Sequence, residues 1–264
     1  MFSDEQKKSY KDLGYVIFRN AINPSILDDL FKTLLSLLNS YTEIKDNNFR
    51  SFSDQLFHNV MLKVRKEEPE KFSSIYQAIQ KSCSINNLTT NINIVKYAAS
   101  ILDDETYNLS NTISVLRMDP PNDQKNHFGF HQDSAYLDYP ELVKNINGDN
   151  NVTFWMPLLD VDKTKGAIKL CEKSHLHNFA HTYKVLPTSN PIPLNIIDKF
   201  SIYDAELNLG DIILFHGNMM HSSGINSSSM IRFSFVTRYY RMCEKDFYLN
   251  PKSGEKIKGI NGSN

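Results

Sequence analysis

The spacing of apolar residues predicts helices along most of the N-terminal half of the chain. Over residues 24–38, apolar side chains recur at the period of an α-helix, with Asn23 placed as N-cap and Pro24 at the first helical position. A shorter helix is expected over residues 3–13, with Ser3 as its N-cap. Further helices are expected over residues 54–81 and 91–108, with polar breaks at Asn86, Asn87 and Asn108.

From about residue 111, short apolar runs separated by turn residues predict β-strands instead. The expected strands cover residues 112–118, 128–133, 152–157, 167–171, 207–209, 212–215 and 230–240. One β-rich run, residues 15–18, also lies in the N-terminal half. Many short strands with Gly and Asp turns are typical of a β-sandwich or barrel.

We therefore expect one domain over residues 1–264, mainly β with flanking helices. A helical N-terminal half, about 1–110, would pack around a β-core at about 111–242. Two long irregular stretches, 134–151 and 176–206, interrupt the β-core. Long loops inside a compact fold often act as lids, and the tyrosines and histidines in these two favour that interpretation.

Composition excludes several classes of function. The formal net charge is −1 and the isoelectric point about 6.7, so no electrostatic footprint for nucleic acid or an anionic membrane is expected. The charged N-terminus does not resemble a signal peptide, and no apolar stretch is long enough to span a membrane. Three cysteines without a CxxC pair predict no disulfide framework and favour a cytoplasmic protein.

His131, Asp133 and His221 form the strongest candidate site. Residues two apart on a strand project from the same face, so His131 and Asp133 can act together. His221 follows a predicted buried strand and could supply a third ligand from another strand. Two imidazoles and one carboxylate, with the other side of the metal open, are typical of non-haem Fe(II) oxygenases.

The other histidines are weaker candidates as ligands. His127 shares the alternation of His131, and we interpret it as a possible substrate contact. His216 is the rival of His221, but its odd spacing places it on the opposite face of a regular strand. A zinc site at the remaining cluster lacks a cysteine or carboxylate to complete it. That cluster consists of His175, His177 and His181.

Arg232 lies on a predicted strand, between apolar residues. Burying a guanidinium there is costly unless an anion meets it. Taken alone, Arg232 favours a structural salt bridge; beside the metal ligands, it favours a bound carboxylate of an oxo-acid co-substrate.

Several motifs, in order and spacing, resemble the phytanoyl-CoA dioxygenase family of Fe(II)/2-oxoglutarate oxygenases, and the resemblance covers most of the chain. The matching segments are Gly14–Ile17, Phe128–Asp133, Phe154–Leu158, Lys165–Ala167, Ser174–His175, Gly210–Asp211, His221–Asn226 and Arg232. One departure is Lys173, where the family usually has glycine, and it bears on the local turn.

The resemblance implies a double-stranded β-helix, or jelly roll, with flanking helices. His131, Asp133 and His221 would ligate Fe(II), and Arg232, with Ser223, would bind the C5 carboxylate of 2-oxoglutarate. Trp155 would line the co-substrate site or pack in the core. The implied reaction uses O2, releases succinate and CO2, and hydroxylates a C–H bond. Halogenases that resemble this family lack the carboxylate ligand, so Asp133 favours hydroxylation.

Two alternatives stay open: a non-redox metalloenzyme on a cupin-like fold, such as an isomerase or hydrolase, and a catalytically silent binding protein. The expected partner is a small-molecule substrate. Candidate substrate contacts are His127, Phe130, Tyr136 and Arg117, with Arg238 and Arg241 equally interpretable as solvated surface residues. These cations would suit an anionic or polar substrate.

Overall fold

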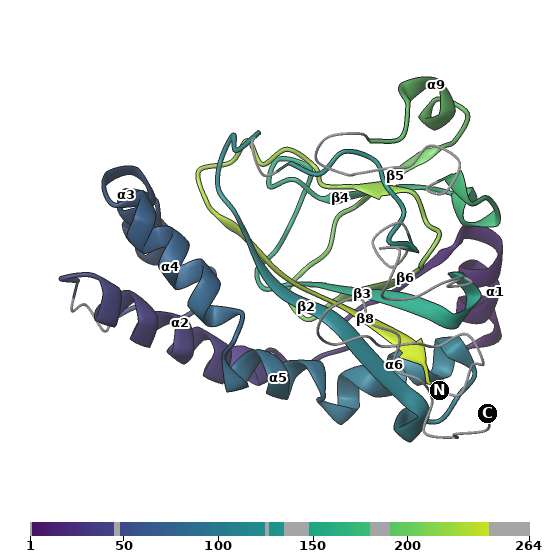
Figure 1. The fold of residues 1–264 in the computed structure, drawn as a ribbon, viewed down its shortest axis with the longest axis horizontal. Coiled ribbons are helices and arrows are strands. Elements are labelled where there is room, and N and C mark those ends of the chain that lie inside the picture. The colour runs from purple at the N-terminus through teal and green to yellow at the C-terminus, as the bar shows by residue number, and fades with distance from the viewer. Residues whose placement is uncertain (1, 45–47, 125–126, 135–147, 180–190, 243–264) are drawn as a thin grey trace, which may run out of the picture.

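Two antiparallel sheets carry the fold of the computed structural model, which describes residues 2–44, 48–124, 127–134, 148–179 and 191–242. The larger sheet has the strand order β1-β6-β3-β8-β2 and the smaller one β5-β4-β7. The smaller sheet lies over one face of the larger, and helices cover the other face (Figure 1). This is the expected double-stranded β-helix with flanking helices.

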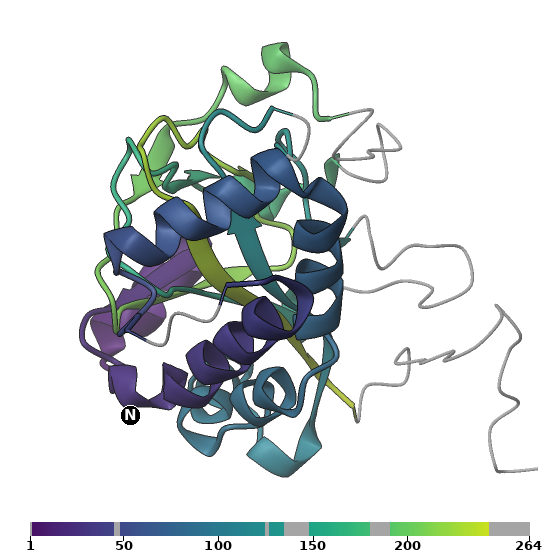
Figure 2. The same ribbon diagram turned by 90° about the vertical axis from the view of Figure 1, so that its left-hand side faces the viewer.

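The strands are β1 (Tyr15–Phe18), β2 (Leu109–Asp119), β3 (Asn151–Pro157), β4 (Ile168–Cys171), β5 (Ile202–Ala205), β6 (Ile212–His216), β7 (His221–Ser222) and β8 (Arg232–Arg241). The α-helices are α1 (Asp4–Leu13), α2 (Asp28–Tyr41), α3 (Gln55–Glu67), α4 (Pro69–Ile79), α5 (Cys83–Thr89), α6 (Ile92–Leu102) and α9 (Leu194–Ile197). Short 3₁₀ turns are η1 (Pro24–Leu27), η2 (Thr106–Asn108), η3 (Gly148–Asn150) and η4 (Ser174–Leu176). Seen from the side, the helices of the N-terminal half lie in front of the sheets (Figure 2).

The predicted helices are present, but some boundaries differ. Helix α1 begins at the Ser3 capping box as expected. The expected helix 54–81 is two helices, because Pro69 begins α4 directly after Glu68. The predicted break at Asn86-Asn87 is wrong: α5, capped by Ser82, runs through it.

The β-core departs from prediction at three places. Residues 128–133 form no regular strand; His131 makes a single antiparallel bridge to His221. Leu207 likewise makes one bridge, to Val161, in place of a strand over 207–209. Strand β5 lies inside the stretch 176–206, which was predicted to be irregular. Periodicity missed β5 because its exposed and half-buried positions carry little apolar signal.

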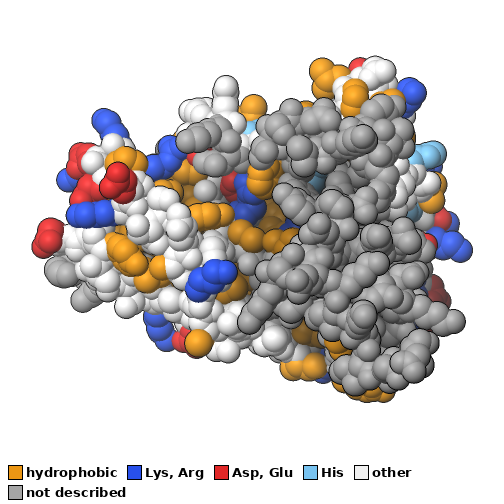
Figure 3. Space-filling view, viewed as in Figure 1, with side chains coloured by type: hydrophobic (Ala, Val, Ile, Leu, Met, Phe, Trp, Pro, Cys, Tyr) orange, Lys and Arg blue, Asp and Glu red, His pale blue; other side chains and the backbone are white. Residues whose placement is uncertain are grey.

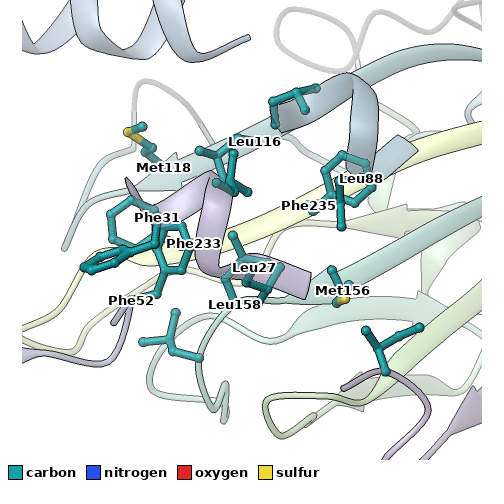
Figure 4. Packing of buried hydrophobic residues seen from close by; sticks show 14 of the residues in the cluster. Leu27, Phe31, Phe52, Leu88, Leu116, Met118, Met156, Leu158, Phe233 and Phe235 are labelled. Atoms are coloured by element: carbon teal, nitrogen blue, oxygen red, sulfur yellow. The ribbon is translucent and has the colours of Figure 1, made fainter. Parts of the chain in front are cut away.

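Alternation along β8 divides its side chains between two environments. Phe233 and Phe235 pack with residues of α2 and β2 in the large core beneath the helices (Figure 4). Val236 belongs to a second apolar cluster between the two sheets. Arg232 and Arg238 lie an even number of positions from Val236, so they project from the same face of β8 and line the space between the two sheets. The strand therefore places two arginines between the sheets.

Within the described residues, no helix is both long enough and apolar enough to cross a membrane.

Candidate active site

The side chains of His131, Asp133 and His221 meet between the two sheets. Nε2 of each histidine lies 3.8 Å from Oδ1 of Asp133. All three are buried, and their possible ligand atoms lie within 4.8 Å of one another. No other such group of His, Cys, Asp or Glu occurs among the residues the structure describes.

A backbone bridge sets the distance between the two histidines. The amide of each donates to the carbonyl of the other, at 3.0 Å and 2.9 Å, and their ring centroids lie 4.2 Å apart. The bridge and the turn after it therefore bring His131 and Asp133 together, as predicted, although these residues do not form the regular strand that was expected.

Backbone carbonyls orient both imidazoles as metal ligands. Nδ1 of His131 lies 2.8 Å from the carbonyl oxygen of Gly129, and Nδ1 of His221 lies 2.9 Å from that of Met219. A carbonyl only accepts, so each Nδ1 carries the proton and each Nε2 presents a lone pair toward Asp133. Such carbonyl partners are the usual support of metal-binding histidines.

Burial keeps both imidazoles neutral. It lowers the pKa of His131 to about 3, with the neighbouring His221 adding to the effect. The pKa of His221 is also lowered, chiefly by burial. Burial alone would raise the pKa of Asp133, but Arg238 and the histidines outweigh it and hold that pKa below its ordinary value. Two neutral imidazoles and an ionised carboxylate form the donor set that a divalent cation requires.

Asp133 is held by two residues that the sequence did not assign to the metal site. Arg238 donates to both carboxylate oxygens, at 2.8 Å and 2.9 Å, and the Thr153 hydroxyl donates to Oδ2 at 2.6 Å. The interpretation of Arg238 as a solvated surface residue is wrong, because its side chain is 12% exposed. Arg238 and Arg232 lie an even number of positions apart on β8, so their side chains share one face of the strand. This spacing was the signal in the sequence that Arg238 belongs to the site. Arg241, the other such candidate, pairs with Asp104.

Arg232 is buried and forms a salt bridge with Asp119. Its Nε and Nη2 donate to Asp119 Oδ2 at 3.2 Å and 2.8 Å, and Nη1 donates to the carbonyl of Gly166. These contacts use three of the five guanidinium N–H groups and leave one on each terminal nitrogen. The side chain therefore retains two N–H groups that could donate to a carboxylate.

A cavity of about 250 Å³ joins the candidate ligands His131 and His221 to Arg232. Its lining consists of Tyr76, Ile113, Val115, Arg117, Phe128, His131, Trp155, Ile168, Phe215, His221, Ser223, Arg232, Val236 and Arg238. The predicted cofactor residues Trp155 and Ser223 and the predicted substrate contact Arg117 are thus brought together.

Two predicted substrate contacts are not among the residues that line this cavity. His127 points its Nε2 at the carbonyl of Ser223, 2.8 Å away. Phe130 packs against a separate apolar cluster that includes Ile192 and Ile196. Tyr136 lies outside the described residues, as does most of the stretch 134–151.

His216 and His175 lie apart from the candidate metal ligands, and His181 lies outside the described residues. His216 pairs with Asp149 at 2.9 Å, and its ring lies 5.3 Å from that of His175. His216 ends β6 and His221 begins β7, in different sheets, so the two do not share the regular strand on which the comparison of their faces rested. Lys173, where the family usually has glycine, adopts the left-handed backbone with φ 66°, so the turn keeps a conformation that glycine favours.

A groove of about 730 Å³ runs from the cavity along α4 and the end of β2. It shares Tyr76, Arg117 and Phe128 with the cavity. The Arg117 guanidinium lies 4.6 Å from the centre of the Phe128 ring and also pairs with Asp119. In the view of Figure 3, hydrophobic side chains lie beside Lys, Arg and acidic side chains near the middle of the visible face.

Solved structures share this fold. The epimerase SnoN, in complex with Fe3+, alpha-ketoglutarate and nogalamycin RO, matches with a TM-score of 0.64 and 15% identity, covering 98% of this chain and 91% of that one. The non-heme monooxygenase ThoJ matches at 0.57 and 18%, covering 89% and 77%. EvdO2 from Micromonospora carbonacea var. aurantiaca, complexed with 2-oxoglutarate, matches at 0.54 and 14%, covering 91% of each chain.

Family membership rests on the sequence. The model of the phytanoyl-CoA dioxygenase (PhyH) family matches residues 10–234, which include the three candidate ligands and Arg232. The cofactors of that family are Fe(II), 2-oxoglutarate and O2, and the histidine and aspartate groups described above are a donor set suited to the metal. The chain therefore belongs to the phytanoyl-CoA dioxygenase family of Fe(II)- and 2-oxoglutarate-dependent enzymes.

Proposed function

We propose that this protein is a dioxygenase that hydroxylates a C–H bond of a small or medium-sized metabolite. When bound, Fe(II) with 2-oxoglutarate and O2 supplies the oxidant and yields succinate and CO2. The observation that carries the proposal is that His131, His221 and Arg232 line one cavity, while Asp133 lies beside the two histidines.

In this proposal, His131, Asp133 and His221 hold the metal from one side. Their Nε2 atoms and Oδ1 converge, so the opposite side faces the cavity and stays available for co-substrate and O2. The Asp133 carboxylate also bears on the type of reaction, because halogenases that resemble this family lack a carboxylate ligand at this position. Asp133 thus favours hydroxylation over halogenation.

Arg232 would orient 2-oxoglutarate through its far carboxylate. Its two remaining N–H groups form a charge-assisted fork, and Asp119 and Gly166 prevent the guanidinium from rotating. Ser223 could add a hydroxyl, and the ring of Trp155 would form an apolar wall. A fixed donor pair loses little entropy on binding, which favours tight and oriented binding of the co-substrate.

The primary substrate would lie where the cavity meets the groove, near Tyr76, Arg117 and Phe128. Among the described residues, Asp119 is shared by two arginines, Arg117 and Arg232. One carboxylate then faces two guanidinium groups, and the far carboxylate of 2-oxoglutarate would balance the remaining positive charge, so this end of the cavity favours a polar group on the substrate. The apolar side chains around it would contact the carbon to be oxidised.

We also propose a single domain over residues 1–264. In support, β1 of the N-terminal half pairs with β6 of the β-core, from Tyr15 opposite Phe215 to Phe18 opposite Ile212.

A cytoplasmic location is proposed from cysteine usage; Cys83 and Cys171 are both free thiols.

The test is succinate formation by purified protein with Fe(II), 2-oxoglutarate, O2 and a panel of carboxylated, phosphorylated and neutral metabolites. We expect substrate-dependent succinate and a product heavier by one oxygen. His131→Ala should abolish both, while His177→Ala, a change at an exposed histidine, should not. Metal binding without 2-oxoglutarate binding would instead indicate a non-redox enzyme, and no divalent-metal binding would indicate a silent binding protein.

A further inference from the structure

We propose that Arg238 and Thr153 are positioning residues: they hold the Asp133 carboxylate in place before a metal arrives and leave one of its oxygens to serve as the ligand. This inference rests on the proposed metal site and extends it to two residues outside the ligand set. It assigns Arg238, which lines the cavity, to the metal centre rather than to the substrate.

The guanidinium of Arg238 meets the carboxylate edge to edge. Nε donates to Oδ2 of Asp133 at 2.9 Å, and Nη2 donates to Oδ1 at 2.8 Å. On the other side, Nη1 donates to the carbonyl of Ile113 at 3.3 Å. The arginine is therefore anchored to β2 while it binds the carboxylate, so it cannot swing away without breaking contacts on both sides.

Strand register explains why two residues far apart in sequence converge on Asp133. Thr153 of β3 lies directly opposite Arg238 of β8. Opposed residues of an antiparallel pair project from the same face, here toward the space between the two sheets. The hydroxyl and the guanidinium thus approach the carboxylate together.

The two oxygens of Asp133 have different surroundings. Oδ2 accepts from Thr153 and from Nε of Arg238. Oδ1 accepts from Nη2 of Arg238 and lies 3.8 Å from each Nε2 of His131 and His221. A metal between the imidazoles would meet Oδ1, whereas Oδ2 is already engaged by two donors. The arrangement therefore favours ligation through a single oxygen.

Charge gives the proposal a signature that a purely structural arginine would lack. Asp133 has no exposed side-chain surface, and removing its cationic partner leaves a buried negative charge uncompensated. A divalent metal would supply the same countercharge. Loss of Arg238 should therefore weaken the metal-free protein far more than the metal-loaded protein.

The experiment is thermal unfolding of the full chain, without metal and with Co(II) under anaerobic conditions, for the wild type and Arg238→Met. Without metal, the variant should melt about 5 °C or more below the wild type. Added Co(II) should raise its melting temperature by more than it raises that of the wild type. An equal fall with and without Co(II) would overturn the proposal.

Arg241→Met is the matched control. Arg241 lies on the same strand and pairs with Asp104, Nε to Oδ2 at 3.1 Å, but this pair is not at the metal site. The change should leave the response to Co(II) as in the wild type. If Arg241→Met reproduced the response of Arg238→Met, the effect would not be specific to Asp133, and the proposal would fail.

A double-mutant cycle tests the coupling, and also provides an answer should Arg238→Met fail to fold. In an Asp133→Asn background, Arg238→Met should lower the melting temperature much less than it does alone, because the charge to be balanced is gone. Additive effects would contradict the proposal.

Arg238→Lys and Thr153→Val test the single-oxygen geometry. Lysine keeps the charge but not the fork, so it should restore part of the metal-free stability. In both variants, the visible absorption of bound Co(II) should differ from that of the wild type. Unchanged spectra in both would overturn the positioning role. Failure of the wild type to bind Co(II) would instead overturn the proposed metal site itself, a distinguishable result.

Discussion

Arg232 and Asp119 lie directly opposite each other on β8 and β2, and Nη2 of the arginine is 2.8 Å from Oδ2 of the aspartate. Arg117, two residues before Asp119 on the same strand, binds the same carboxylate. The arginine proposed to orient 2-oxoglutarate is therefore held by a carboxylate that a second arginine shares. This relationship makes Asp119 a determinant of both stability and co-substrate binding.

Asp119→Asn should lower the free energy of unfolding by about 3 kcal/mol, because it leaves the buried Arg232 without its counterion. Urea denaturation of the 2-oxoglutarate-free protein measures this change. Asp104→Asn, which alters the more exposed pair with Arg241, should cost about 1 kcal/mol or less. Equal losses in the two variants would contradict the role assigned to Asp119.

The same carboxylate predicts a pH dependence. Burial would raise the pKa of Asp119, but Arg232 and Arg117 outweigh it and lower the pKa to about 2. A carboxyl with a lowered folded-state pKa contributes stability above its unfolded pKa of about 4 and loses it as pH falls toward 2. The full contribution is on the order of 2 kcal/mol. The stability difference between wild type and Asp119→Asn should therefore shrink below pH 4; a difference constant from pH 6 to pH 3 would refute the assignment.

Arg232→Lys should weaken 2-oxoglutarate binding by about 10-fold to 100-fold, because the ammonium keeps the charge but not the two-pronged geometry. The KM for 2-oxoglutarate, measured by succinate formation, should rise accordingly. Arg241→Lys on the same strand should leave it unchanged. An unaltered KM in Arg232→Lys would show that another group binds the far carboxylate.

Gly166→Ala should impair both folding and co-substrate binding. Gly166 has φ +79°, and an added Cβ would lie 2.6 Å from the carbonyl oxygen of Gly224. Its own carbonyl accepts a hydrogen bond from Arg232, so a backbone shift would move the guanidinium. We expect a loss of about 2 kcal/mol in unfolding free energy. The KM for 2-oxoglutarate should rise as well. A loss of stability with an unchanged KM would show that the turn at Gly166 does not set the position of Arg232.

The sequence predicted that the candidate metal ligands lie together, but it did not predict the backbone that carries them. The spacing of His131 and Asp133 placed them together, yet the residues before them form no regular strand; a single bridge to His221 brings the ligands together. Residues two apart can still bring their side chains together on an irregular segment, because the two side chains need to converge at only one point.

Partners of the arginines could not be predicted in the same way. Asp119 and Arg232 are 113 residues apart, and Asp133 and Arg238 are 105 apart. Such pairs depend on the order of strands in the sheet, which periodicity does not specify. Strand β5 and helix α5 were missed for a related reason, since tertiary packing stabilises segments whose local signal is weak.

The most direct test of the central claim is an anaerobic calorimetric titration of 2-oxoglutarate into the protein, with and without Fe(II). The account predicts one molecule bound per chain in the presence of Fe(II), and much weaker binding without it or in Asp133→Ala. Absence of Fe(II)-dependent 2-oxoglutarate binding in the wild-type protein would contradict it.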